Sequence, residues 1–252
     1  MRFLVLRLEG PLMSFSDAAV DELRRTRELP GLSMLTGLVA NALGLRFTDG
    51  NRLRRLQERL VYGARLDRKG QLLRDFQTAQ LNKNDLLWRS DGLGPERREG
   101  GEGSFSGPTL RERFYRADSR VCVVLSLVPE DESPTLDDLA AAFARPFRPL
   151  FLGRVCCPPS GPLHRGEVVD ALDAYDALER AAPGEQSDPA PLTALWPADG
   201  PGARRPVDMA AGRIVELHDL RDWRNDVHSG SRYAVSGPVH PCGVSAKGEV
   251  QS

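Results

Sequence analysis

The sequence predicts an α+β fold of the ferredoxin-like type, in a chain of 252 residues that could hold one large domain or two small ones. Three observations lead there: an alternating apolar strand opens the chain, an amphipathic helix follows it, and a nearly continuous apolar run lies midway. RNA-recognition domains share the split β-α-β order and stack bases on the open face of the sheet. We therefore expect a sheet of the RNA-recognition-motif-like type.

The first half of the chain holds three strands and two helices. Residues 2–8 alternate between the two faces of a strand, and a helix follows that Ser33 can cap and Gly44 can end. A second, short helix comes next. Residues 61–67 and 71–80 then predict two strands joined by a tight turn.

The second half begins with the most apolar segment of the chain. Residues 120–128 predict a central strand that is buried on both faces. Thr135 and Asp138 form a candidate capping box for the helix that follows. Two late strands are expected within 212–220 and 232–241.

These elements divide the chain into four parts. Residues 1–182 hold the ferredoxin-like core, with a basic thumb insertion at about 81–114 where a short connection would suffice. Residues 183–206 are rich in proline, glycine and alanine, which predicts a flexible excursion. Residues 207–242 carry the C-terminal strands, which we expect to pack on the core, and 243–252 are expected to be a disordered tail.

Charge is distributed unevenly along a chain whose net charge is only −1. Residues 52–120 carry 16 basic and 10 acidic side chains, net +6, whereas residues 121–200 carry 5 and 13, net −8. Such a contrast indicates a localised anionic ligand, with the acidic part facing solvent or a basic partner. Random clustering is the competing explanation.

Several classes of protein and site are not expected. The chain has neither an apolar run of 18 residues nor the layout of a signal peptide, so we expect a cytoplasmic protein without membrane contact. The adjacent Cys156 and Cys157 indicate neither a disulfide framework nor a zinc site. No phosphate-binding glycine loop with its lysine is present, and no metal or other cofactor is expected.

The insertion has the composition of a loop that binds single-stranded RNA. Arginine matches phosphate with two parallel hydrogen bonds, and Trp88 could stack on a base for about 1–3 kcal/mol. Asn82 and Asn84 could contact the edges of unpaired bases. A solvated surface hairpin kept mobile by its glycines has the same composition. The six basic residues of the insertion are Lys83, Arg89, Arg97, Arg98, Arg111 and Arg113.

Five segments, in order within residues 1–165, resemble the CasD family, the subunit of CRISPR Cascade complexes that binds the RNA handle. The most similar form is the type I-E subunit. Each segment alone is a weak match, and the five in sequence are a strong one. They are LVLRLEGPLMSFSD, LPGLSMLTGLVANALGL, LLRDFQTAQ, RERFYRADSRVCVVLSL and PLFLGRVCCP.

The resemblance implies a repeat-associated protein with a ferredoxin-like domain and an extended thumb at 81–114. It implies that the protein caps one end of a guide-RNA complex and grips the repeat-derived 5′ handle of the CRISPR RNA. The implied protein partners are the adjacent backbone subunit and the large subunit, which inspects target DNA. In type I-E systems another subunit cuts the precursor RNA, whereas in type I-C systems the CasD relative cuts it.

The family motifs also select residues. Ser33 matches the motif serine, and Arg154 matches the arginine of the Leu-Gly-Arg turn. Leu32 stands where the family usually has a basic residue, which Arg24 or Arg25 could replace. We expect backbone N–H groups to meet phosphate at the helix start and in the preceding loop. The candidate RNA-binding residues are Met13, Ser14, Arg24, Arg25, Ser33, Arg74, Asn82, Lys83, Trp88, Arg89, Arg97, Arg98, Arg111, Arg113 and Arg154.

Two alternatives to a non-catalytic RNA-binding subunit remain open. A metal-independent endoribonuclease would need an acid and a base, for which Tyr115 and His164 are the plausible pair. A protein-only adaptor would direct its acidic segment, residues 121–200, toward a basic partner and would not touch RNA.

Overall fold

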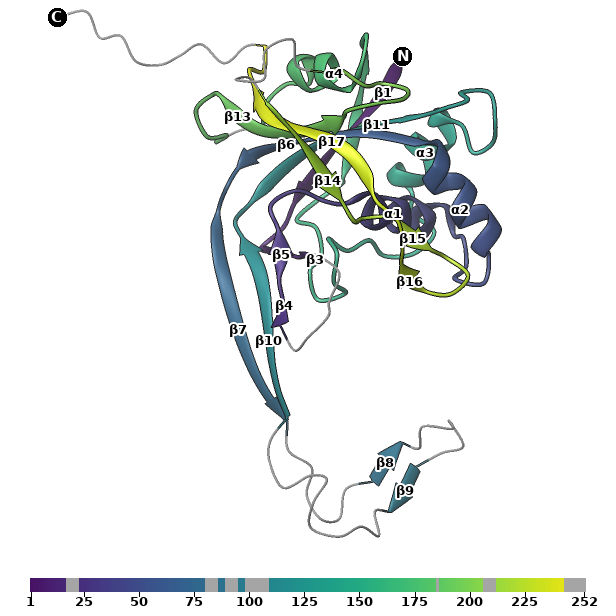
Figure 1. The fold of residues 1–252 in the computed structure, drawn as a ribbon, viewed down its shortest axis with the longest axis vertical. Coiled ribbons are helices and arrows are strands. Elements are labelled where there is room, and N and C mark those ends of the chain that lie inside the picture. The colour runs from purple at the N-terminus through teal and green to yellow at the C-terminus, as the bar shows by residue number, and fades with distance from the viewer. Residues whose placement is uncertain are drawn as a thin grey trace, which may run out of the picture.

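A seven-stranded antiparallel sheet forms the centre of the molecule (Figure 1). Its strand order is β12-β1-β11-β6-β13-β17-β14. The strands are β1 (Arg2–Glu9), β6 (Leu60–Arg68), β11 (Arg120–Leu127), β12 (His164–Asp170), β13 (Leu192–Pro197), β14 (Arg213–Leu217) and β17 (Arg232–Val239). The computed structural model describes residues 1–16, 23–79, 86–88, 95–97, 109–184, 186–205 and 212–242.

In the part of the chain that the structure describes, four helices flank this sheet, which agrees with the predicted mixture of helices and strands. They are α1 (Leu32–Leu43), α2 (Gly50–Arg59), α3 (Leu136–Ala144) and α4 (Ala174–Arg180). Within the described residues, no helix is long and apolar enough to cross a membrane.

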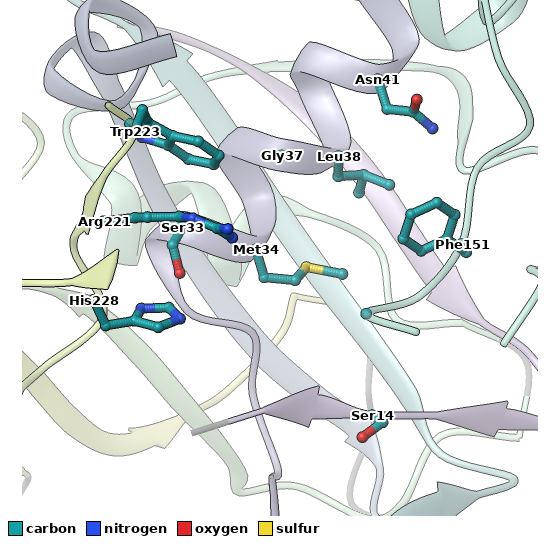
Figure 2. Close-up of a pocket in the computed structure, with 11 residues that line it drawn as sticks. Ser14, Ser33, Met34, Gly37, Leu38, Asn41, Phe151, Arg221, Trp223 and His228 are labelled. Carbon is teal, nitrogen blue, oxygen red and sulfur yellow. The ribbon is translucent and has the colours of Figure 1, made fainter. Parts of the chain in front are cut away.

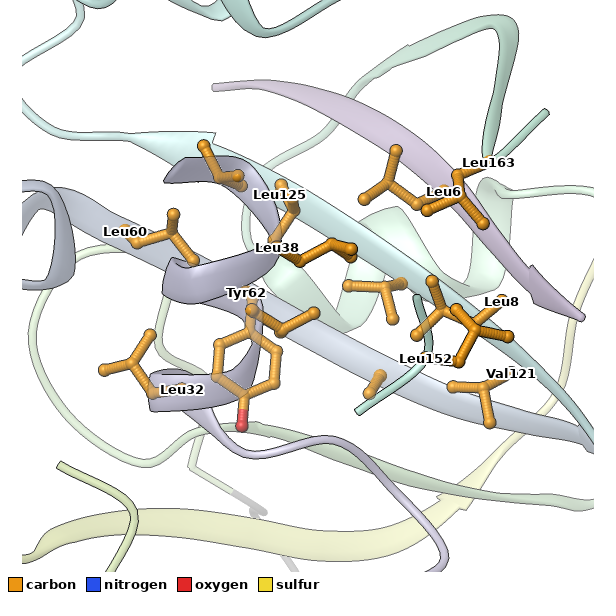
Figure 3. Packing of buried hydrophobic residues seen from close by; sticks show 14 of the residues in the cluster. Leu6, Leu8, Leu32, Leu38, Leu60, Tyr62, Val121, Leu125, Leu152 and Leu163 are labelled. Atoms are coloured by element: carbon orange, nitrogen blue, oxygen red, sulfur yellow. The ribbon is translucent and has the colours of Figure 1, made fainter. Parts of the chain in front are cut away.

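The predicted alternation of β1 is confirmed, and it supplies a core on each side of the sheet. Leu4, Leu6 and Leu8 belong to the larger core, which also contains buried residues of α1, α2 and α3. Figure 3 shows Leu6 and Leu8 in this core together with Leu38 of α1. Phe3 and Val5 belong to the second core on the opposite face. The central strand β11 contributes to both cores, as its continuous apolar sequence predicts.

The face that the sequence analysis expects to be open is covered by α4. The small stripe Ala174, Ala177 and Ala181 lets this helix lie close to the sheet, where all three are fully buried. Phe3 beneath it has no exposed surface. Bases therefore cannot stack there as they do on an open RNA-recognition sheet.

Helix α1 begins differently from the prediction. Ser33 is not the cap, because the helix starts after Gly31 and has no side-chain cap from its own sequence. Instead, the Asp219 carboxylate accepts a hydrogen bond from the Leu32 amide at 2.8 Å. Gly44 does end the helix, with a φ of 79°, and the capping box of Thr135 and Asp138 is present in α3.

The structure also differs from the excursion expected over 183–206. Residues 192–197 form β13, which pairs with β6 on one side and β17 on the other. Its apolar residues, including Leu192 and Trp196, are buried, so burial outweighs the surrounding proline and glycine. Through β13 the late strands β14 and β17 extend the large sheet. The tail from 243 onward lies outside the described residues.

A long two-stranded ribbon projects from this body (Figure 1). It consists of β7 (Gln71–Ala79) and β10 (Thr109–Ala117), paired over their whole length. Two short strands, β2 (Leu12–Met13) and β4 (Leu23–Arg24), pair with β10. The remaining strands of the described part of the chain form two-stranded antiparallel sheets. These are β3 (Phe15–Ser16) with β5 (Thr26–Arg27), β8 (Leu86–Trp88) with β9 (Pro95–Arg97), and β15 (Arg221–Asp222) with β16 (Val227–His228).

Candidate nucleic-acid interface

One face of the ribbon is basic. Arg111, Arg113 and Tyr115 alternate along β10, so their side chains share this face. Strand β4 runs parallel to β10 with Arg24 opposite Arg113, which adds a third arginine. Asp75 lies opposite Arg113 on β7 and offsets part of this charge. We call this surface, defined by Arg24, Arg111 and Arg113, the basic face.

The other face of the ribbon carries exposed apolar side chains between charged ones. Leu72 and Phe76 are each 55% exposed there, and Leu110 is 40% exposed. Arg74 lies among them and forms an ion pair with Glu112. The structure thus separates Arg74 from the other arginines with which the sequence analysis grouped it. We call this surface, defined by Leu72, Phe76 and Leu110, the apolar face.

Arg154 joins the basic face to the body. Its guanidinium lies over the ring of Tyr115, 4.8 Å from the ring centroid. It also donates hydrogen bonds to the carbonyl oxygen of Arg24 at 3.1 Å and to that of Phe114 at 3.5 Å. These contacts link β4 to β10, so Arg154 positions the two strands that carry the arginines of the basic face. Arg25, the neighbour of Arg24, is exposed between β4 and β5.

A cavity of about 300 Å³ adjoins the base of the ribbon, between α1, the turn at 151–153 and the β15–β16 hairpin (Figure 2). Ser14 connects the cavity to the ribbon, because its hydroxyl donates to the carbonyl oxygen of Phe114 at 3.1 Å. The apolar lining is Met34, Leu38, Phe151 and Trp223. The polar lining is Ser14, Ser33, Asn41, Arg221 and His228.

Gly153 allows two of these segments to meet. It has a φ of +92°, and a Cβ added there would lie 1.8 Å from the carbonyl oxygen of Ser14. A side chain at this position would force the turn and the Ser14 segment apart. This close contact explains why the Leu-Gly-Arg turn has a glycine at its second position.

The sequence analysis missed Arg221 and His228. They lie opposite each other across the β15–β16 hairpin, and both line the cavity. The guanidinium of Arg221 lies 5.0 Å from the ring centroid of Trp223 and pairs with Asp226, and burial lowers its pKa. No spacing in the sequence signals these residues, because the fold brings them to α1 from the far end of the chain.

The backbone amides that were expected to meet phosphate are already engaged. The Ser14 amide donates to the carbonyl oxygen of Leu152 at 3.1 Å, and the Ser33 amide donates to that of Asp219 at 3.0 Å. Met13 is fully buried in the larger core. Ser14 and Ser33 therefore line the cavity without free backbone donors, and Met13 packs in the core, which corrects the expectation for all three residues.

The outer part of the insertion is only partly described. Trp88 lies opposite Pro95, and Arg97 opposite Leu86, in the hairpin of β8 and β9. The remaining candidates of the insertion lie outside the described residues; they are Asn82, Lys83, Arg89 and Arg98.

The fold places the candidate acid–base pair on different sheets. Tyr115 is 4% exposed beneath Arg154, and its hydroxyl lies 3.7 Å from the Cys156 sulfur. His164 begins β12, with Nδ1 3.1 Å from the carbonyl oxygen of Val5. Within the described ranges, no cluster of three or more His, Cys, Asp or Glu residues could hold a metal ion.

Comparisons with known proteins agree with this architecture. A chain described as "CRISPR RNA-guided surveillance complex" has a TM-score of 0.67 at 24% identity, covering 95% of this chain and 90% of its own. Another, described as "Crystal structure of Cas protein", has a TM-score of 0.57 at 23% identity, covering 95% and 97%. At these identities the likeness shows the fold.

The sequence comparisons go further. A family model described as "CRISPR-associated protein (Cas_Cas5)" matches residues 3–235, and the chain belongs to this family. The "CRISPR system Cascade subunit CasD" of Escherichia coli (strain K12) is 30% identical over 177 residues, which span 70% of this chain and 75% of that protein.

Proposed function

We propose that this chain is the RNA-binding subunit of a type I-E CRISPR Cascade surveillance complex and grips the 5′ handle of the CRISPR RNA. The observation that carries the proposal is the basic face, where Arg24 lies opposite Arg113 and Arg111 follows two residues away on the same side of β10. Guanidinium groups in such a row can follow the phosphates of a single strand. The Cascade name of the Escherichia coli relative supports the proposed assembly.

The cavity beside the basic face would receive one unpaired base. Its volume of about 300 Å³, apolar floor and polar rim suit a flat heterocycle with hydrogen-bonding edges. Arg221 and His228 would contact the base or its phosphate from the rim. A strand that lies on the basic face would reach the cavity past Ser14, which lines the cavity and donates a hydrogen bond to β10.

The apolar face of the ribbon would contact protein. Exposed apolar patches on a projecting element commonly mark sites of association, and Leu72, Phe76 and Leu110 form such a patch. We assign this patch to the adjacent backbone subunit, so that the ribbon lies between RNA on one face and protein on the other. The large subunit would bind elsewhere on the body, and target DNA would be reached only indirectly.

Binding without cleavage is the proposed activity. The Tyr115 ring is covered by Arg154, and His164 contacts a main-chain carbonyl of β1. The two residues lie on different sheets and do not act at one common site, which supports a non-catalytic role. The order β1-α1-β6-β11-α3-β12 supports the proposal that these elements form a ferredoxin-like unit.

The test uses labelled repeat-containing RNA without divalent metal, with the wild-type chain and its partner subunits. We expect intact RNA and retention of the handle, and we expect the double variant Arg111→Ala/Arg113→Ala to lose at least tenfold in affinity. Arg213→Ala, at an exposed position on β14, is the matched control. Specific cleavage would favour the endoribonuclease, and equal affinity for all three chains would favour the protein-only adaptor.

A further inference from the structure

A second cavity, of about 580 Å³, lies between α2 and the segment from Glu132 to Ala141. In Figure 1 helices α2 and α3 lie on the opposite side of the body from the ribbon. The cavity has an apolar wall that includes Leu43, Leu45 and Leu56, and a basic wall of three arginines from α2. We call this second cavity the groove, and it does not belong to the proposed RNA interface.

The three arginines differ in how well they are paired. Arg55 donates two hydrogen bonds to the Glu132 carboxylate. Arg59 is 1% exposed and donates to the carbonyl oxygens of Pro129 and Glu132, yet its buried Nε has no hydrogen-bond partner. Arg52 is exposed, and among the described residues no carboxylate pairs with it. The guanidinium of Arg52 and the Nε of Arg59 could therefore each bind a further anionic group.

The surroundings argue against nucleic acid as the ligand. Glu132 and Asp138 line the groove, and Asp131 and Asp137 precede them directly in the chain. Glu58 pairs with Arg54 and Arg55 of α2. A polyanion would bring further phosphates against these carboxylates. A single carboxylate next to an apolar side chain avoids this repulsion, because the carboxylate can meet Arg52 while the apolar group contacts the leucine wall.

We propose that this groove docks a segment of another protein subunit in which an Asp or Glu adjoins an apolar side chain of leucine or phenylalanine size. The incoming carboxylate binds Arg52 and competes with Glu132 for Arg55. Oε2 of Glu132 lies 3.7 Å from the Nε of Arg59, so a small turn of the released carboxylate gives that orphaned donor an acceptor. The inference rests on the proposed membership of a complex but not on RNA binding.

The experiment places a benzophenone photo-crosslinking amino acid at the exposed position 141, on the wall of the groove, in the assembled and purified complex. Crosslinked peptides are identified by mass spectrometry. We expect a peptide of a partner subunit with Asp or Glu beside an apolar residue. Arg52→Glu is expected to lower the yield at least tenfold. Arg54→Glu, on the same helix but outside the groove lining, should leave the yield within twofold.

Three outcomes would overturn the groove proposal: a crosslink to RNA, no protein crosslink from position 141, or an equal loss in Arg52→Glu and Arg54→Glu. Retention of the RNA handle is measured in the same preparations. If the wild-type complex does not retain the RNA handle but still gives the protein crosslink, only the proposed RNA function is contradicted. Retained RNA without a crosslink would contradict the groove proposal alone.

Discussion

The carboxylate of Asp219 accepts a hydrogen bond from the backbone amide of Leu32 at 2.8 Å, across 187 positions of the chain. Asp219 is 5% exposed and also accepts two hydrogen bonds from Arg232, each at 2.9 Å. A buried anion at the positive end of α1 stabilises the helix start. The C-terminal part of the chain thus fixes the helix turn that brings Ser33 to the cavity.

Replacing Asp219 should destabilise the fold. Asp219→Ala removes the helix partner and leaves the guanidinium of Arg232 without its counter-ion. We therefore expect the free energy of unfolding to fall by about 3–5 kcal/mol, the range for breaking a buried pair. Urea denaturation measures this, with the exposed Asp199→Ala as control. Equal midpoints for the two variants would contradict the assigned role.

Replacing Arg65 should destabilise the fold as much as replacing Asp219, because Arg65 connects β6 to the end of α4. Its guanidinium is fully buried, donates to the carbonyl oxygens of Leu178 and Ala181 at the end of α4, and pairs with Asp67 at 2.6 Å. Arg65→Met removes the donor to Oδ1 of Asp67 and the donors to the carbonyl oxygens of Leu178 and Ala181. Oδ2 of Asp67 keeps the Gly184 amide at 3.3 Å and the Arg7 guanidinium at 3.5 Å. We expect a loss of about 3–5 kcal/mol in the free energy of unfolding. Arg213→Met should change it by less than about 0.5 kcal/mol.

A series of glycine variants separates backbone strain from steric clash. Gly161→Ala meets nothing within 4 Å and has no positive φ, so its cost should stay below about 0.5 kcal/mol. Gly166→Ala is also in open space but at a φ of +82°, which should cost about 1–2 kcal/mol.

Gly153→Ala adds to the same backbone strain the clash with Ser14. We expect it to cost more than about 3 kcal/mol and to weaken RNA binding, because the cavity wall must move. Thermal unfolding and RNA titration of all three variants measure this order. A Gly153→Ala protein as stable as Gly166→Ala would show that the close approach to Ser14 has no energetic consequence.

The two faces of the ribbon should respond differently to salt. Arg113→Ala, on the basic face, removes one proposed phosphate partner and is expected to lower the slope of log affinity against log salt by about 0.7. Arg74→Ala should leave this slope unchanged, because Arg74 lies on the apolar face and pairs with Glu112. Titrations of the assembled complex with labelled RNA at several salt concentrations test the contrast, which fails if both slopes fall equally.

Cys122 should make stability depend on pH in alkaline solution. Burial raises the pKa of this thiol from 9.0 to about 11. The folded state keeps the proton longer than the unfolded state, so the stabilisation is complete below pH 9 and is lost as pH rises toward 11. Under reducing conditions we expect the wild-type chain to lose about 2–3 kcal/mol more than Cys122→Ala over this window. Denaturation curves of both chains at pH 8 and pH 11 measure this. An equal loss of unfolding free energy in the wild-type chain and in Cys122→Ala would contradict the role of the thiol.

Patterns that lie within a single element were read correctly from the sequence. The alternation along β1, the continuous apolar run of β11, the Gly44 helix end and the capping box of α3 all depend on neighbours a few residues apart. Their energetics are local, so periodicity and capping chemistry predict them. The family resemblance rests on five short sequence segments in order, which are also local signals.

The candidate site was only partly predictable. Its arginines could be named from charge and motif. Their division between two faces depends on strand register, which places Arg74 and Arg113 on different faces of the ribbon. The cavity depends on contacts between remote segments, including Arg221 with α1.

The sequence by itself therefore determined the local elements named above, the segregation of charge and the family. The tertiary structure alone decided that α4 covers the second sheet face, that Asp219 caps α1, and that β13 joins the sheet. Each of these depends on burying a group against a distant partner. The free energy of such burial belongs to the pair, and neither local sequence carries a signal of it.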